Sequence, residues 1–380
     1  MAKRNVLRTR LCEVLQIEYP ILLAGMGNSS GPHLAAAVSN AGGLGMLGAT
    51  LLGPDEIRAF IRQTRELTDK PFGVDILMPE AVPQGGSPEE LRRLLPQEHV
   101  AFIEKLKKQF NTPAAKGRQF PLTLEFARSQ FQVVLEEKVP VFAAGLGSPE
   151  WVIPEAHAHG IKVISLVGNV RNARRVKDRG ADIIVAQGHE AGGHTGRIAT
   201  MALVPPVVDA VSPIPVVAAG GIGDGRGIAA ALALGAAGVW LGTAFLATRE
   251  AFVDHVAIGY LDKATVEHYQ RRILEATEED ARVYRIFTGK TGRALRSKFT
   301  DIWEKSGMST LPMPLQWTLV TDFQRGMMEA GDPDFQQLWA GQIAGMIKQI
   351  RGAEELVAEL VDGTIRVLKK VIPTQVTMSD

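Results

Sequence analysis

Residues 188–196 read GHEAGGHTG, and this stretch holds the clearest candidates for chemistry: His189, Glu190 and His194, separated by glycines. These three side chains could bind a metal, but the H-E-x-x-H spacing that presents ligands on one face of a helix is absent. A histidine is also well suited to act as general acid or base near neutral pH. The glycines would keep the space over a planar ligand clear. We therefore predict no metal and expect one of the two histidines to move a proton.

Two glycine-rich stretches further along the chain could bind a phosphate group. AAGGIGDGRG (218–227) and LGTAFLATRE (241–250) each follow an apolar run and open a helix. Backbone N–H groups at such a position attract anions, and glycine lets the backbone approach them closely. Tight turns alone would also explain the glycines, but the two loops together favour phosphate. The predicted phosphate cradle consists of Gly220, Gly221, Gly242 and Thr243.

A third loop, AGMGNSSG (24–31), carries no charged side chain and would suit a flat ring lying against the backbone. Two other glycine stretches do not indicate a nucleotide fold. The G-x-G-x-x-G match at 43–48 lies inside a strand that follows a helix, whereas the dinucleotide fingerprint runs from strand through glycines to helix. TGKTGR (288–293) lacks the glycine spacing of a P-loop. A phosphate site beside a flat-ring site predicts a nucleotide-like cofactor.

The elements that must position these loops recur along the chain. Alanine-rich helical stretches end at a glycine and lead into near-continuous apolar runs, which is the pattern of a parallel sheet covered by helices. Eight units of this kind predict an α/β fold, a TIM (β/α)8 barrel with the candidate loops at the carboxyl ends of its strands. A doubly wound open sheet is the alternative. The expected strands are 20–26, 43–49, 72–77, 139–146, 162–168, 182–188, 214–221 and 238–245.

Three stretches complete the predicted domain organisation. The barrel is expected to occupy residues 1–250, with residues 78–138 as an insertion between strands three and four that lies over its top. Residues 251–335 follow strand eight and read as helices, which predicts a helical lid domain. The last helix, within 336–380, is expected to return to the barrel.

Composition narrows the class of protein. The 380 residues carry 42 Lys+Arg and 41 Asp+Glu, a formal net charge of +1, so the balance gives no reason to expect nucleic acid or a membrane as partner. The single cysteine, Cys12, excludes a disulfide framework and a multi-cysteine metal site. The sequence has neither a transmembrane run nor the apolar region of a signal peptide. We expect a soluble, cytoplasmic protein.

Together, QGHEAGGHTG, SNAGGLGMLGA and VVAAGGIGDGRGIAAALALGAAGVWLGTAFL closely resemble the nitronate monooxygenase (2-nitropropane dioxygenase-like) family. Flavin-dependent enoyl-acyl-carrier-protein reductases share these motifs. The resemblance implies an FMN-binding barrel whose catalytic histidine is the last residue of E-A-G-G-H, His194, and it leaves His189 at a variable position. The cofactor-binding set carried by the resemblance and the loops is Ala24, Gly25, Met26, Asp75, Gln187, Gly192, Gly193, Gly220, Gly221, Gly242 and Thr243.

The chain departs from the family pattern at three points. Family members often carry Asn in the third-strand motif GVN, where this chain has Asp75. A carboxylate there would oppose an anionic reduced ring unless it were protonated or hydrogen-bonded to a ring N–H. The 78–138 insertion is longer than in compact members, and Arg197 adds a charge that either binds an anion or is simply solvated. IMP dehydrogenase shares the barrel but needs a cysteine in its active-site loop. The single cysteine of this chain, Cys12, precedes the first strand, so this alternative is excluded.

The resemblance implies FMN-dependent oxidation of alkyl nitronates by molecular oxygen to a carbonyl compound and nitrite. The alternative is an FMN- and NAD(P)H-dependent reductase of a quinone or of an α,β-unsaturated acyl thioester on CoA or a carrier protein. A third hypothesis, a flavin-free binding barrel, rests on Asp75 alone. The expected partners are a small-molecule substrate with oxygen or NAD(P)H. The sequence names neither the substrate nor the oligomeric state. A homodimer is one of the possible assemblies.

Overall fold

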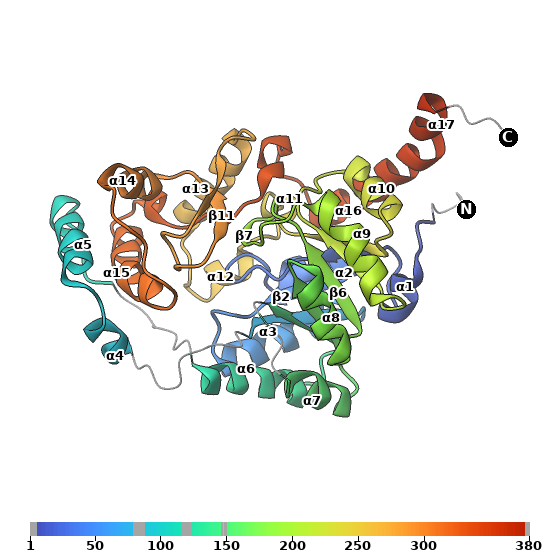
Figure 1. The fold of residues 1–380 in the computed structure, drawn as a ribbon, viewed down its shortest axis with the longest axis horizontal. Helices are drawn as coiled ribbons and strands as arrows, with labels where there is room; N and C mark the ends of the chain where they lie inside the picture. The colour runs from blue at the N-terminus through green and yellow to red at the C-terminus, as the bar shows by residue number, and fades with distance from the viewer. Residues whose placement is uncertain (1–5, 79–87, 116–122, 146, 148–149, 377–380) are drawn as a thin grey trace.

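Eight parallel strands close into a barrel in the computed structural model (Figure 1), which describes residues 6–78, 88–115, 123–145, 147 and 150–376. The strand order is β1-β9-β8-β6-β5-β4-β3-β2, and a parallel bridge between Leu22 and Leu44 joins the two ends. The predicted barrel is confirmed, and the open-sheet alternative is wrong. The strands are β1 (Ile21–Leu23), β2 (Gly45–Gly48), β3 (Phe72–Leu77), β4 (Val141–Gly145), β5 (Lys162–Val167), β6 (Ile183–Gln187), β8 (Val216–Ala219) and β9 (Gly238–Leu241).

Helices cover the outside of the barrel, which explains why its strands are apolar on both faces. The covering helices are α2 (Pro32–Asn40), α3 (Pro54–Leu67), α6 (Leu124–Glu136), α7 (Val152–Ala158), α8 (Val170–Asp178), α9 (Thr200–Val211) and α10 (Gly225–Ala233). Side-chain caps mark where the loop after a strand ends and the next helix begins. At the start of α8, the Asn169 side chain accepts a hydrogen bond from the Asn172 N–H (2.8 Å). No described helix combines the length and apolar character that crossing a membrane requires.

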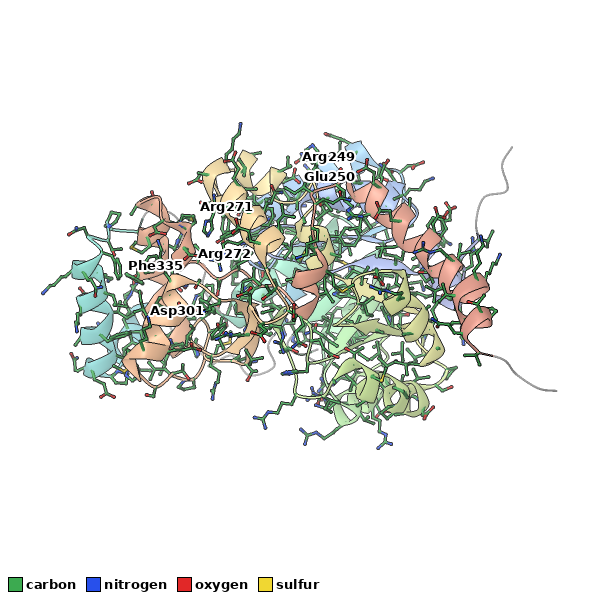
Figure 2. All side chains as sticks on the ribbon, turned by 90° about the horizontal axis from the view of Figure 1, so that it is seen from above. Arg249, Glu250, Arg271, Arg272, Asp301 and Phe335 are labelled. Atoms are coloured by element: carbon green, nitrogen blue, oxygen red, sulfur yellow. The ribbon has the colours of Figure 1, made fainter. Side chains whose placement is uncertain are left out.

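A second hydrophobic core lies beside the barrel and joins two distant parts of the chain. Ile103 and Leu106 of α5 are buried in the same cluster as Phe299, Phe323 and Phe335. Figure 1 shows α5 next to α14 and α15 at one end of the molecule, and Figure 2 labels Phe335 in the same region. The elements of this core are α5 (Gln97–Gln109), α14 (Lys298–Ser306), α15 (Leu315–Glu329) and η1 (Pro333–Phe335).

The described part of the predicted insertion divides between the two cores. α5 joins the second core, whereas α6 lies on the barrel wall, where Phe131 packs edge-on against Phe142 of β4 (4.8 Å between ring centroids). No residue of α4 (Pro88–Arg93) or α5 lines the cavity at the barrel mouth. Residues 79–87 and 116–122 of the insertion lie outside the described part of the chain.

The segment predicted as a helical lid contains a β-hairpin as well as helices. β10 (Ala281–Tyr284) pairs antiparallel with β11 (Gly292–Leu295), and β11 pairs with β7 (Gly193–His194). The helical interpretation therefore fails for residues 281–284 and 292–295, whereas helices form elsewhere in the segment, as expected. Strands of four residues show little periodicity, and their pairing with β7 is a long-range contact that local sequence does not reveal. The domain limits 1–250, 251–335 and 336–380 stay predictions.

The C-terminal helix α16 (Ala353–Arg366) packs on the barrel helices. A Cβ on Gly225 of α10 would lie 2.3 Å from the backbone of Gly363, so the two helices meet at very short range. The Ala353 N–H donates to Glu250 Oε2 (2.9 Å), and Figure 2 shows Arg249 and Glu250 beside this helix. The remaining elements are α1 (Arg10–Leu15), α11 (Thr243–Leu246), α12 (Val253–Ala257), α13 (Lys263–Glu275), η2 (Gln342–Met346), η3 (Val367–Val371) and α17 (Ile372–Gln375).

Candidate active site

A cavity of about 1040 Å³ opens at the carboxyl ends of the barrel strands. Loops that follow the strands line much of it, and residues 288–291 and 337–343 contribute from the far side. A cavity at this end of a TIM barrel is the usual place for a substrate or cofactor. Every residue predicted for the site lines this one cavity: Ala24, Gly25, Met26, Asp75, Gln187, Gly192, Gly193, His194, Gly220, Gly221, Gly242 and Thr243.

The loop after β8 has the backbone shape expected of an anion site. Gly220 and Gly221 have φ of +95° and +72°, a region that favours glycine. A Cβ on Gly220 would also lie 3.0 Å from the Gly188 carbonyl oxygen, so a side chain there would press on the neighbouring loop. The Thr243 Oγ1 accepts a hydrogen bond from the Gly341 N–H (2.8 Å), which leaves its own hydrogen free to be donated to a ligand.

Other glycines of the cavity wall lie at close backbone approaches. A Cβ on Gly25 would lie 2.2 Å from the Asp75 Cβ, so a larger residue would push the ends of β1 and β3 apart. A Cβ on Gly192 would lie 2.7 Å from the carbonyl carbon of Ala340. The loop holding Gly25 is fixed because Ser30 Oγ accepts from the Met26 N–H (2.8 Å). These glycines let neighbouring segments of the cavity wall pack closely against one another.

Asp75 places a carboxyl group among apolar residues of the cavity wall. The residue is 7% exposed, and its Oδ1 is buried without a hydrogen-bond partner among the described residues. Burial raises the pKa of Asp75 to about 8, because the ionised form would lose its hydration. The carboxyl group is therefore mostly neutral at pH 7. This charge state removes the objection that a carboxylate would repel an anionic ring.

His194 lies on β7 at the edge of the same cavity. Its Nε2 is 2.9 Å from Thr288 Oγ1, and its ring lies 5.7 Å from the Trp339 ring. The Gln187 side chain donates to the His194 carbonyl oxygen (2.6 Å) and so fixes the backbone. Burial, and then the positive charge of Lys290, lower the pKa of His194 to about 4. The imidazole is therefore neutral at pH 7, and the same shift makes it a weaker base than an ordinary histidine.

The structure separates the two histidines of GHEAGGHTG. The His189 Nε2 accepts a hydrogen bond from the buried guanidinium of Arg293 (2.9 Å), and its Nδ1 lies 3.3 Å from the Gly196 carbonyl oxygen. His189 is not among the residues that line the cavity. Its role is to hold the loop against β11, which agrees with its assignment as the variable position.

The glutamate between the histidines also has a structural role. Both Glu190 oxygens accept from the Thr200 N–H (3.1 and 3.0 Å), and Oε2 also accepts from the Thr200 hydroxyl (2.9 Å). Within the described residues, no cluster of three His, Cys, Asp or Glu side chains is arranged to hold a metal ion. The geometry of the loop is thus explained by hydrogen bonds within the protein.

Sequence reasoning missed the cavity residues on the side opposite the barrel, among them Thr288, Lys290 and Trp339. Thr288 and Lys290 belong to TGKTGR, whose glycines signalled a turn although the stretch is not a P-loop. The approach of that turn to His194 depends on the β7–β11 pairing. Arg197, whose role the sequence left open, lines the cavity as an exposed side chain, as does Arg171 of α8.

Comparison with known proteins identifies the family of the chain. The pattern of the nitronate monooxygenase family matches residues 8–363. The chain is 39% identical over 376 residues to "Putative monooxygenase Rv1533" of Mycobacterium tuberculosis, covering 94% of this chain and 96% of that protein. It is 33% identical over 361 residues to "Probable nitronate monooxygenase" of Staphylococcus saprophyticus, covering 90% of this chain and 94% of that protein.

Two solved structures share the fold over nearly the whole chain. FabK from Thermotoga maritima matches with a TM-score of 0.75 and 33% identity, covering 97% of this chain and 100% of that one. Nitroalkane oxidase from Streptomyces ansochromogenes matches with a TM-score of 0.79 and 31% identity, covering 96% and 100%. The family pattern and these identities extend across both cores. The chain therefore belongs to the nitronate monooxygenase family, a family of flavin-dependent oxidoreductases.

Proposed function

We propose that the protein binds FMN and oxidises alkyl nitronates with molecular oxygen, giving a carbonyl compound and nitrite. The observation that carries this proposal is that His194, with its Nε2 2.9 Å from Thr288 Oγ1, and Lys290 line the same cavity as the left-handed glycines after β8. A neutral imidazole can take a proton from a nitroalkane carbon, and a nearby ammonium group favours the nitronate anion that results.

The residues present fit FMN. The left-handed backbone at Gly220 and Gly221, with the Thr243 hydroxyl, would hold the phosphate, and the cavity lined by Gly25 and Gly192 would hold the ring. When bound, FMN would supply the electron acceptor and the reaction with oxygen. A flavin-free barrel is no longer supported, because burial keeps Asp75 mostly neutral at pH 7 and the family is one of flavin-dependent oxidoreductases.

Each protein group near the reacting end has a distinct task. His194 would remove the proton from a neutral nitroalkane, and Thr288 would keep its ring in position through the 2.9 Å contact. Lys290 would hold the nitro or nitronate oxygens by charge. Trp339 packs beside His194 and would exclude water from that side. A nitronate that arrives already deprotonated would need Lys290 but not the base.

Oxygen consumption tests this proposal. The purified protein, loaded with FMN, is mixed with propyl nitronate in air-saturated buffer, and oxygen uptake and nitrite are followed together. The expected result is saturable oxygen uptake accompanied by nitrite, above the rate of free FMN with the same substrate. Turnover that does not exceed the rate with free FMN would contradict the proposal.

Replacement of Lys290 should weaken substrate binding and alter His194. In Lys290→Met, the KM for propyl nitronate is expected to rise about tenfold, because a charge contact near a protein surface contributes on the order of 1–2 kcal/mol. The pKa of His194 should also move up towards its ordinary value, because Lys290 lowers it. Lys290→Arg keeps the charge and serves as the control. Equal KM values in Lys290→Met and the unchanged protein would exclude this role.

One specific observation favours a second candidate, the FMN- and NAD(P)H-dependent reductase of an α,β-unsaturated acyl thioester or a quinone. The likeness to FabK extends over 97% of the chain, and the exposed Arg171 and Arg197 line the cavity where an anionic carrier group could bind. Such an enzyme would take electrons from NADH or NADPH rather than from a nitronate. The donor therefore distinguishes the two candidates.

Other parts of the proposal concern the setting of the enzyme. Oxygen accepts the electrons in the preferred function, and the acyl thioester or quinone accepts them in the alternative, where NADH or NADPH is the donor. We further propose a cytoplasmic location, because a chain with a single cysteine forms no internal disulfide, and a homodimer, because two-fold dimers are the commonest soluble oligomers. Size-exclusion chromatography with light scattering would measure the oligomeric state directly.

A further inference from the structure

Asp75 has an arrangement that the proposed reaction does not use. It lies on β3, paired in register with Gly48 of β2 and Ala143 of β4, and it lines the cavity. A Cβ on Gly25 would lie 2.5 Å from Asp75 Oδ2, and a Cβ on Gly145 would lie 4.0 Å from Oδ1. The carboxyl group is thus surrounded by glycine and alanine backbone.

The elements packed against Asp75 carry no titratable side chain. Residues 24–26, β2 and β4 are apolar or glycine throughout. The titratable groups that line other parts of the cavity are Arg171, Arg175, Glu190, His194, Arg197, Tyr269 and Lys290. None of them contributes to the displaced pKa of Asp75, which burial alone raises to about 8. Glu190 is already held by Thr200.

A neutral carboxyl group needs a partner for its O–H. Leaving a buried donor or acceptor unpaired costs on the order of 1–3 kcal/mol, so such groups are nearly always satisfied. The Asp75 Oδ1 has no partner in the described protein, and the open space next to the side chain is the cavity itself. A ligand in the cavity can supply a partner for the carboxyl group, because Asp75 lines the cavity and is 7% exposed.

We propose that Asp75 acts as a neutral acid that donates a hydrogen bond to an acceptor atom on the bound flavin ring, and so makes cofactor binding depend on pH. The inference rests on the proposed binding of FMN but not on the oxidation of nitronates. A ring has several acceptor atoms and few donors, so a protonated partner has more atoms to pair with than an ionised one. Asp75 is thus a positioning residue for the cofactor.

The sign of the pH dependence follows from the donor role. The protonated carboxyl group is present below pH 8 and is lost as the pH rises through this value, so FMN should bind best at pH 7 and more weakly at pH 9. A carboxylate that accepted a hydrogen bond from a ring N–H would give the opposite slope. Ionisation of the FMN phosphate does not contribute to the change in Kd between pH 7 and pH 9, because a phosphate monoester loses its second proton at about pH 6.

Titration of the apoprotein with FMN, followed by flavin fluorescence at pH 7, 8 and 9, tests the inference. For the unchanged protein, the Kd should rise about tenfold between pH 7 and pH 9, as one proton is lost with a pKa about 8. Asp75→Asn can still donate, so its Kd at pH 7 should stay within about threefold of the original and should not change with pH. Asp75→Leu cannot donate, and its Kd should be about tenfold higher at pH 7.

An exposed aspartate on α9, Asp209, provides the matched control, and Asp209→Asn should keep the original pH dependence. A Kd that falls with rising pH, or a tenfold rise that persists in Asp75→Asn, would overturn the donor role while leaving the nitronate reaction intact. If neither the unchanged protein nor any variant bound FMN, both the donor role of Asp75 and the proposed FMN-dependent reaction would be overturned. Circular dichroism of each apoprotein separates loss of fold from loss of binding.

Discussion

Replacing His194 with Asn is expected to lower kcat/KM for nitroethane by about 10²–10⁴-fold, the usual range for loss of a general base. With propyl nitronate the same variant should stay within about threefold of the original, because no proton has to be removed. We expect this difference between the two substrates only for His194, because His194 lines the cavity whereas His189 is bound to Arg293. Oxygen uptake with each substrate measures the two rates.

The pH profile of the nitroethane reaction adds a second readout. A histidine with a pKa near its ordinary value would lose activity below about pH 6.5. The lowered pKa of His194, about 4, keeps the base neutral, so the rate should be level from pH 6 to pH 8 and fall only near pH 4. His189→Asn is the control, because it should change both substrates equally. A variant at His194 that impaired both substrates equally would contradict the role as base.

Asp75→Asn should stabilise the apoprotein, and the gain should grow with pH. The folded protein keeps the Asp75 proton up to about pH 8, whereas the unfolded chain releases it near the ordinary value of 3.8. Below pH 4 both states are protonated and no cost arises. Between pH 5 and pH 8 the original protein should lose about 4 kcal/mol relative to Asp75→Asn, from about 1.4 kcal/mol per pH unit.

Urea unfolding of the apoprotein at pH 5 and pH 8 measures this difference. The comparison across pH cancels any fixed cost of burying an amide in place of a carboxyl group. Asp209→Asn again provides a control on an exposed position and should follow the original protein at both pH values. Curves for Asp75→Asn that run parallel to the original would show that Asp75 is ionised in the fold.

The barrel and its mouth could be predicted from the sequence because their signals are local. Each apolar run with a following loop identifies a strand end, and parallel strands bring all such ends to one rim. Residues as distant as Gly25 and Thr243 therefore line one cavity, as predicted. Their roles in binding FMN stay predictions until a cofactor is measured.

The far side of the site could not be predicted in the same way. Thr288 and Lys290 reach His194 only because β11 pairs with the two-residue strand β7, and no local pattern announces a pairing of that length. The protonation state of Asp75 also could not be predicted from the sequence. Its neutrality comes from neighbours that offer neither a cation nor a hydrogen bond, which requires the three-dimensional packing.

The donor of electrons to the flavin is the most direct test of the central claim. The FMN-loaded protein is mixed without oxygen with propyl nitronate, and separately with NADH and NADPH, and the visible absorption of the flavin is recorded. The account predicts that propyl nitronate removes the absorption, that readmitted oxygen restores it with release of nitrite, and that neither nucleotide acts at a comparable rate. Rapid loss of absorption with NADH or NADPH, with propyl nitronate inert, would contradict it and support the reductase.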